Sequence, residues 1–135
     1  MSRAKAEELR APILAEIGAH GSVAGPDPSL LSQPPNAILK ALGWAGKTPK
    51  DVDLYVINEA FASVALQSMS DLEIDASNVN VNGGAIAMGH PVGASGARIA
   101  LHLVLELGRR GGGLGAAGLC GGGGQGEAQL LHVNR

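Results

Sequence analysis

The sequence predicts an α/β fold: a layered domain with a mixed sheet, covering helices and a final antiparallel strand pair. Short apolar segments typical of strands alternate with segments of helical periodicity along the whole chain. The 21 glycines and 7 prolines cluster between these segments, so they mark turns and not a low-complexity chain. The last two strand-like segments are joined by a short glycine-rich turn, which favours an antiparallel pair.

The first half of the chain supplies the outer elements of this prediction. A helix over residues 4–9 ends before Pro12, and residues 13–23 form an extended segment. A proline-rich surface loop follows, and Asn36 is expected to cap a helix over residues 37–44 that ends at Gly43 and Gly46. Residues 52–57 then form a strand.

The second half continues the alternation. The predicted elements are a helix over residues 59–72, a strand that opens the stretch 78–98, a helix over residues 96–110, and strands over residues 114–120 and 127–133. No internal repeat or second domain is visible, so residues 1–135 are expected to form one domain.

The helix that follows the stretch 78–98 is apolar almost all the way round. Between residues 97 and 107 the pattern leaves Arg98, His102 and Glu106 to meet water. A helix that covers one face of a single sheet needs only an apolar stripe, so this helix is expected to be covered on both sides. In so small a chain, the second cover would come from another chain or from a missing half.

Composition excludes several classes of protein. A net charge of −2 gives nucleic acid no basic footprint, and the longest apolar run is too short to span a bilayer. The single cysteine excludes an internal disulfide framework, and four scattered histidines offer no spacing typical of structural zinc. The charged N-terminus has no apolar h-region, so a cytoplasmic location is the default.

A glycine-rich loop within residues 78–98 carries His90. The glycines around it permit close approach to the main chain, and Pro91 restricts the backbone of His90 toward extended conformations. An imidazole held stiffly among bare backbone amides indicates a reaction site. The alternative is a glycine-rich connection whose histidine is merely hydrogen-bonded.

Two further polar side chains come at the carboxyl ends of strands. Asn58 follows one strand, and its amide could donate to a carbonyl oxygen; Cys120 ends another, beside a glycine turn whose amides could bind an anion. Because α/β folds collect ligands at this edge, Asn58, His90 and Cys120 are expected to converge, with surroundings that favour the thiolate. Alternatively, Asn58 is a helix N-cap and Cys120 a buried small apolar residue.

Other motifs give weaker evidence for a functional site. His20, His102 and His132 lie in no comparable loop and are treated as structural. The pattern G-x-G-x-x-G occurs at Gly121 and again at Gly113, but neither match precedes a predicted helix. The dinucleotide interpretation therefore fails its structural condition.

Three ordered motifs resemble the C-terminal half of the thiolases, over nearly all of the chain. They are Asn58-Glu59-Ala60-Phe61-Ala62; Asn80-Val81-Asn82-Gly83-Gly84-Ala85-Ile86-Ala87 running into Gly89-His90-Pro91-Val92-Gly93-Ala94-Ser95-Gly96-Ala97-Arg98; and Cys120-Gly121-Gly122 before Gly123-Gly124-Gln125-Gly126. The form of the first motif is similar to the acetyl-CoA acetyltransferase and 3-ketoacyl-CoA thiolase branch. The resemblance implies acyl transfer between coenzyme A thioesters, by Claisen condensation or thiolysis, with acyl-CoA and CoA as substrates and no cofactor or metal.

The resemblance also implies roles for four residues. His90 would take the proton of a nucleophilic cysteine, and Cys120 would act as acid and base at the α-carbon of acetyl-CoA. Asn58 would orient a water that, with His90, holds the enolate oxygen. The amide of Gly122 would help to stabilise the tetrahedral acyl intermediate.

The chain departs from the family pattern in several ways. Thiolases carry the acyl-accepting cysteine in an N-terminal half that is not present here, and the first strand of the C-terminal half is also expected to be missing before Met1. Gly121 stands where an apolar residue is common. The implied partner is an N-terminal half or a further copy of the chain. The alternative is a non-catalytic acyl-CoA-related binding module or a truncated, inactive thiolase remnant.

Overall fold

The computed structural model describes residues 1–134; Arg135, the last residue of the predicted domain, lies outside the described residues. The helices are α1 (Arg3–Glu8), α2 (Gln33–Trp44), α3 (Ala62–Leu72), α4 (Ala85–Met88) and α5 (Ser95–Arg109), with short 3-10 helices at Pro49–Asp51 and Ala76–Asn78. The strands are β1 (Glu16–Ala24), β2 (Leu54–Ile57), β3 (Gly113–Gly121) and β4 (Gln125–Val133).

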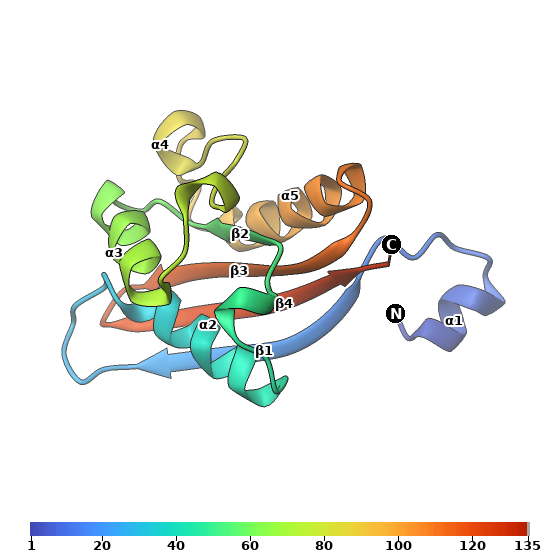
Figure 1. Ribbon diagram of the computed structural model, residues 1–135, viewed down its shortest axis with the longest axis horizontal. Coiled ribbons are helices and arrows are strands. Elements are labelled where there is room, and N and C mark those ends of the chain that lie inside the picture. The colour runs from blue at the N-terminus through green and yellow to red at the C-terminus, as the bar shows by residue number, and fades with distance from the viewer. Residues whose placement is uncertain (135) are drawn as a thin grey trace.

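The strands form one mixed sheet in the order β1-β4-β3-β2 (Figure 1). β4 pairs antiparallel with both β1 and β3, and β2 pairs parallel with β3. The predicted final antiparallel pair is confirmed, with Gly113 opposite Val133 and Gly121 opposite Gln125. The predicted α/β class with a mixed sheet is confirmed as well.

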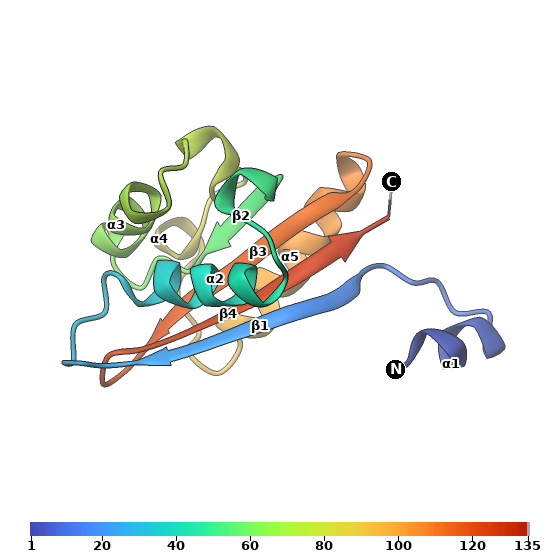
Figure 2. The ribbon, with the colours of Figure 1, turned by 60° about the horizontal axis from the view of Figure 1, so that its bottom comes forward.

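Helices cover both faces of the sheet, which makes three layers (Figure 2). On one face α2 packs on β1, β3 and β4, with α3 beside it, over a core that includes Ile38, Leu42 and Tyr55. On the other face α5 packs on β2, β3 and β4 through Ile99, Leu103 and Leu107. The alternation of β2 and β3 side chains between these two cores explains their apolar, small-residue sequences.

Glycines in β3 let the helices approach the sheet. A Cβ at Gly115 would lie 2.6 Å from Leu103 Cδ1, and one at Gly118 would lie 2.9 Å from Ile38 Cδ1. Both contacts are shorter than van der Waals packing allows, so each glycine admits a helix side chain on its own face.

Several predicted boundaries are wrong. α2 begins at Gln33, so Asn36 lies inside the helix and is not its cap, because prolines in a first turn lack only an N–H that would be unpaired there. α3 begins at Ala62 and not at residue 59, since the chain is still extended at Phe61. The strand expected from residue 78 is reduced to isolated bridges, Tyr55 with Val79 and Val81 with Gly83, because Asn80 has φ +48°.

α5 differs from its prediction in which side chains meet water. Glu106 is buried, because the guanidinium groups of Arg109 and Arg110 and the amide of Asn82 all donate to its carboxylate. These bonds hold the pKa of Glu106 far below its ordinary value. Leu101 and Leu105 are instead 55% and 56% exposed, so one apolar side of α5 is open within the described chain, as the pattern predicted.

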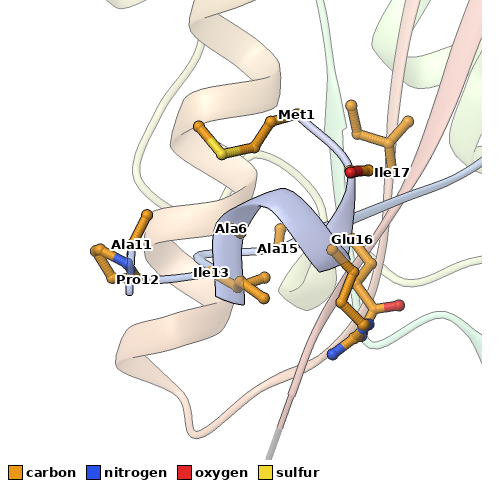
Figure 3. Close-up of a pocket in the computed structure, with 10 residues that line it drawn as sticks. Met1, Ala6, Ala11, Pro12, Ile13, Ala15, Glu16 and Ile17 are labelled. Carbon is orange, nitrogen blue, oxygen red and sulfur yellow. The ribbon is translucent and has the colours of Figure 1, made fainter. Parts of the chain in front are cut away.

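The N-terminal arm, which comprises α1 and the residues up to the start of β1, stands apart from the rest of the chain (Figures 1 and 2). A cavity of about 410 Å³ lies between α1 and the start of β1. Figure 3 shows Met1, Ala6, Ile13 and Ile17 around it. It lies at the opposite end of the sheet from the carboxyl ends of β1 and β3 and contains no predicted site residue.

Candidate active site

Asn58 and His90 come together at the carboxyl end of β2. Asn58 directly follows the strand and is 2% exposed, and its backbone N–H donates to Gly118 O of β3 at 2.9 Å. Its side-chain Nδ2 lies 3.4 Å from Nε2 of His90, which stands in the exposed loop between α4 and α5. Because the loop brings His90 back over the strand end, two of the predicted residues face each other.

Ser95, at the start of α5, orients the imidazole. Its buried hydroxyl donates to Pro91 O at 3.0 Å and lies 2.6 Å from Nδ1 of His90. Since the single hydroxyl hydrogen is used on Pro91, Ser95 Oγ accepts from Nδ1–H. This assigns the proton to Nδ1 and leaves the lone pair of Nε2 toward Asn58 Nδ2, which donates to it. An imidazole in this tautomer can accept a proton at Nε2 from a substrate or a thiol.

Asn80 fastens the glycine loop to the end of β2. Its Oδ1 accepts from Ile57 N and its Nδ2 donates to Ile57 O, each at 2.9 Å. The side chain thus takes the place of the next residue of a neighbouring strand. The positive φ of Asn80 turns the chain away immediately afterwards, which is why no longer strand forms here.

Glu59 extends this attachment to α4. Its Oε1 accepts from Asn80 Nδ2 at 3.0 Å and its Oε2 accepts from Ile86 N at 2.9 Å. A Cβ at Gly84 would lie 2.5 Å from the carboxylate, so the glycine is needed for Glu59 to reach this place. Glu59 directly follows Asn58 at the end of β2. The residue that positions the segment leading to His90 is therefore the neighbour of the residue that faces His90.

Exposed apolar side chains lie close in the sequence to Asn58 and His90. Phe61, Ile86, Met88 and Val92 are 61%, 66%, 54% and 83% exposed. They come from the start of α3, from α4 and from the loop that follows it. So many exposed apolar side chains in neighbouring loops indicate a contact surface for a ligand or for another polypeptide.

Cys120 ends β3 next to the strand that carries Asn58. The parallel register places Ile57 opposite Gly118, and Cys120 lies two residues further on. The thiol is partly buried against the α2 side of the core, and burial raises its pKa above the ordinary value. The expectation that its surroundings favour the thiolate is therefore wrong for this chain as folded, and within residues 1–134 no hydrogen bond joins Cys120 to His90.

Gly122 lies in the turn between β3 and β4. It is exposed, and a Cβ built on it would meet no atom within 4 Å. The neighbouring Gly124 is different: it has φ +76°, and its Cβ would lie 2.0 Å from Asp27 O. The turn is thus fixed at Gly124 and open at Gly122.

Three supporting residues were not identified as site residues from the sequence. Ser95, Asn80 and Glu59 all lie in the quoted motifs, but spacing alone does not indicate that their side chains bond to the loop. Ser95 could have been found from its place five residues after His90, at the first turn of the predicted helix. Of the predicted residues, the structure brings Asn58 and His90 into contact and leaves Cys120 near the end of β3 and Gly122 on the turn that follows it.

Two classes of site are not found in the described part of the chain. Residues 1–134 contain no group of three or more His, Cys, Asp or Glu side chains that could hold a metal ion. No helix within the same residues is long and apolar enough to cross a membrane.

Known proteins share both the sequence and the fold. Residues 11–133 match the family model described as "Thiolase, C-terminal domain". A probable acetyl-CoA acetyltransferase of Mycolicibacterium smegmatis is 63% identical over 132 residues, which is 98% of this chain and 34% of that protein. The human mitochondrial 3-ketoacyl-CoA thiolase is 52% identical over 111 residues, 82% of this chain and 28% of that protein.

Solved structures agree. The crystal structure of human mitochondrial 3-ketoacyl-CoA thiolase in complex with CoA matches with a TM-score of 0.93 and 44% identity, over 99% of this chain and 34% of that one. The chain thus spans about a third of the length of the curated relatives and solved chains that it matches.

Proposed function

The chain belongs to the thiolase family, as a C-terminal domain, and from that premise we propose that it supplies the histidine and the acid/base cysteine of a thiolase-type acyltransferase. The reaction is acetyl-CoA C-acetylation by Claisen condensation, or the reverse thiolysis of a 3-ketoacyl-CoA. The observation that carries the proposal is the Asn58–His90 pair, in which the unprotonated Nε2 of His90 faces the amide of Asn58 at the strand end. The names of the relatives supply the class of substrate.

Each residue then has a chemical task. His90 Nε2 accepts the proton of a cysteine thiol, and the thiolate attacks the acyl carbon of a thioester while CoA leaves as a thiol. Cys120 removes an α-proton from the second acetyl-CoA, and the carbanion attacks the acyl-enzyme. The Asn58 amide orients a water that, with His90, stabilises the enolate oxygen, and the Gly122 amide stabilises the tetrahedral intermediate.

This chemistry needs a second cysteine. Cys120 is the single thiol of the chain, and it cannot carry the acyl group and move the α-proton at once. We therefore propose that residues 1–135 are the C-terminal domain of an assembly whose other half carries the nucleophile. The partner is an N-terminal thiolase half, or further copies of such a protein, placed on the open side of α5 near Leu101 and Leu105.

The setting follows from the same chemistry. The substrates are acyl-CoA and CoA, and neither a cofactor nor a metal takes part. A protein that handles coenzyme A thioesters and a reactive thiol suits lipid metabolism in a reducing, cytoplasmic compartment. Net charge −2 offers no attraction for nucleic acid.

One observation favours a second function. The pKa of the Cys120 thiol is raised by burial, which lowers its thiolate fraction at neutral pH. A chain with this single thiol would bind acyl-CoA without turning it over. It would then be a binding module or an inactive thiolase remnant.

The test is complementation with a separately made N-terminal half that carries the nucleophilic cysteine. The 135-residue chain alone is expected to show essentially no acetoacetyl-CoA thiolysis, and the mixture is expected to recover it, because groups that act as a unit lose most of their effect when one is missing. His90→Ala or Cys120→Ala abolishes the recovered activity, whereas the exposed His132→Ala does not. Robust thiolysis by the chain alone contradicts the proposal; binding of acetyl-CoA with no recovered turnover favours the second function.

A further inference from the structure

A small pocket at the end of β2 is lined in part by Asn58. Its volume is about 80 Å³. It lies between the end of β2, the glycine loop, α4 and α5, and its lining includes Val56, Asn58, Asn80, Met88, Ile99 and His102. The cavity belongs to none of the steps in the proposed reaction.

Two polar atoms of this lining are buried without a hydrogen-bond partner. They are Oδ1 of Asn58, whose residue is 2% exposed, and Nε2 of His102. His102 as a residue is partly exposed on α5, but this ring nitrogen is covered. A buried polar atom left unpaired costs about 1–3 kcal/mol, so two of them on one cavity require an explanation.

We propose that this cavity is a binding site for ordered water, which bridges Asn58 Oδ1 and His102 Nε2. The volume exceeds the roughly 10–15 Å³ that one water needs by the same measure, and a buried water typically makes two to four hydrogen bonds. Water donates to the amide oxygen, which can only accept, and it either accepts from or donates to the imidazole nitrogen, according to the tautomer. Water satisfies both atoms without bringing a net charge into the pocket.

The bridge gives His102 a positioning role. With Oδ1 bound to the water, the amide of Asn58 has one orientation, and Nδ2 is directed at His90. His102 lies on the same helix as Ser95, which orients His90, so α5 orients both members of the pair. The relevance to catalysis rests on the proposed function, but the water site does not.

The decisive experiment is a high-resolution crystal structure of the chain, with NMR of the Asn58 side-chain amide. We expect density for a water within hydrogen-bond distance of Asn58 Oδ1 and His102 Nε2, and a magnetisation-transfer peak between that water and the Asn58 amide protons. Absence of the water in the wild-type chain, or a direct bond between the two side chains, overturns the proposal. This result does not depend on whether any variant folds.

Variants of His102 separate positioning from packing. His102→Phe keeps the bulk but removes the nitrogen, so the water peak is lost and a second Asn58 amide orientation appears; His102→Gln, which keeps a polar atom, retains the peak. His132→Gln, on the exposed face of β4, is the matched control and leaves the Asn58 amide unchanged.

In the complemented enzyme, His102→Phe lowers kcat about tenfold with little change in KM. A His102→Phe spectrum identical to wild type overturns the role of His102, whereas a water that persists without any recovered thiolysis contradicts the proposed function alone.

Discussion

The Asn58–His90 pair and the turn that carries Gly122 are held by different means. The pair is held by side chains: Ser95 on the imidazole, Asn80 on the end of β2, and Glu59 on Asn80 and α4. The turn is held by main chain, through Gly25 N donating to Gly124 O at 2.9 Å and through the close approach of Asp27 O. The Asn58–His90 pair thus has its direction set by specific side chains, while the turn leaves open space around Gly122.

The largest effect is expected where the turn is fixed. Gly124→Ala forces a side chain into a left-handed backbone and against Asp27 O, and should lower the free energy of unfolding by about 3 kcal/mol. Gly122→Ala is the matched control, with open space around its Cβ, and should change it by less than about 0.5 kcal/mol. Urea titration measures the free energy of unfolding of both variants. Equal effects at the two glycines would show that the turn is not anchored at one end.

The attachment of α4 is tested at Glu59. Gln keeps the size but has one acceptor oxygen, so Glu59→Gln leaves either Asn80 Nδ2 or Ile86 N facing a donor and should cost about 1–3 kcal/mol. The exposed Glu73→Gln is the control in the same urea titration. The His90 imidazole signals should also broaden in the first variant. Unchanged stability and unchanged His90 signals would remove Glu59 from the attachment.

Ser95→Ala tests what orients the imidazole. The variant loses the acceptor for Nδ1–H and the bond to Pro91 O, and should cost about 1 kcal/mol. The sharper readout is the pair of imidazole ¹⁵N shifts of His90, which should move from one tautomer to a mixture. Ser70→Ala, on an exposed position of α3, should leave them unchanged. A single tautomer retained in Ser95→Ala would mean that another group fixes His90.

The smallest expected effect is the change in stability with pH that comes from the Cys120 thiol. The direction of this change shows whether the fold favours the thiol or the thiolate. Because burial raises the pKa of the thiol, the folded state keeps a proton that the unfolded chain releases. Its contribution to stability is therefore full below the ordinary thiol pKa and is lost as the pH rises toward the folded pKa. Iodoacetamide alkylation should be slower in the folded chain than in the chain unfolded by urea, with its midpoint at a higher pH. Faster alkylation of the folded chain would restore the expectation of an activated thiolate.

Helices and strands with a clear hydrophobic periodicity could be predicted from the sequence. Helix boundaries and side-chain contacts that depend on tertiary structure could not. The apolar runs in β2, β3 and β4 and the periodicity of α5 identify a mixed sheet between helices. The start of α2 was missed because Pro34 and Pro35 resemble a loop until the first turn of a helix is recognised as their proper place. Arg109 and Arg110 lie three and four residues after Glu106, a spacing that places them beside it on the helix. The third partner of Glu106, Asn82, is distant in the sequence, and no local pattern indicates that contact.

The members of the candidate site could be proposed from the sequence, but most of its geometry could not. Strand ends and the glycine loop pointed to Asn58, His90 and Cys120, since each follows a recognisable strand or turn. The proton position on His90 depends on Ser95, and the raised pKa of Cys120 depends on how deeply β3 is packed. Both follow from tertiary contacts, which a single sequence does not show.

The strand order has a consequence for how the chain acquires its shape. Among the strand pairings, β3 with β4 is the local one: Glu16 of β1 pairs with His132 near the other end of the chain, and Leu54 of β2 pairs with Gly115. Closing such long loops is entropically unfavourable and makes folding slow. During synthesis β1 has no partner until β4 has left the ribosome, and Asn58 has no neighbour in the sheet until β3 has. The candidate site is therefore among the last parts of the molecule to exist, and an unfinished chain exposes apolar strands in its place.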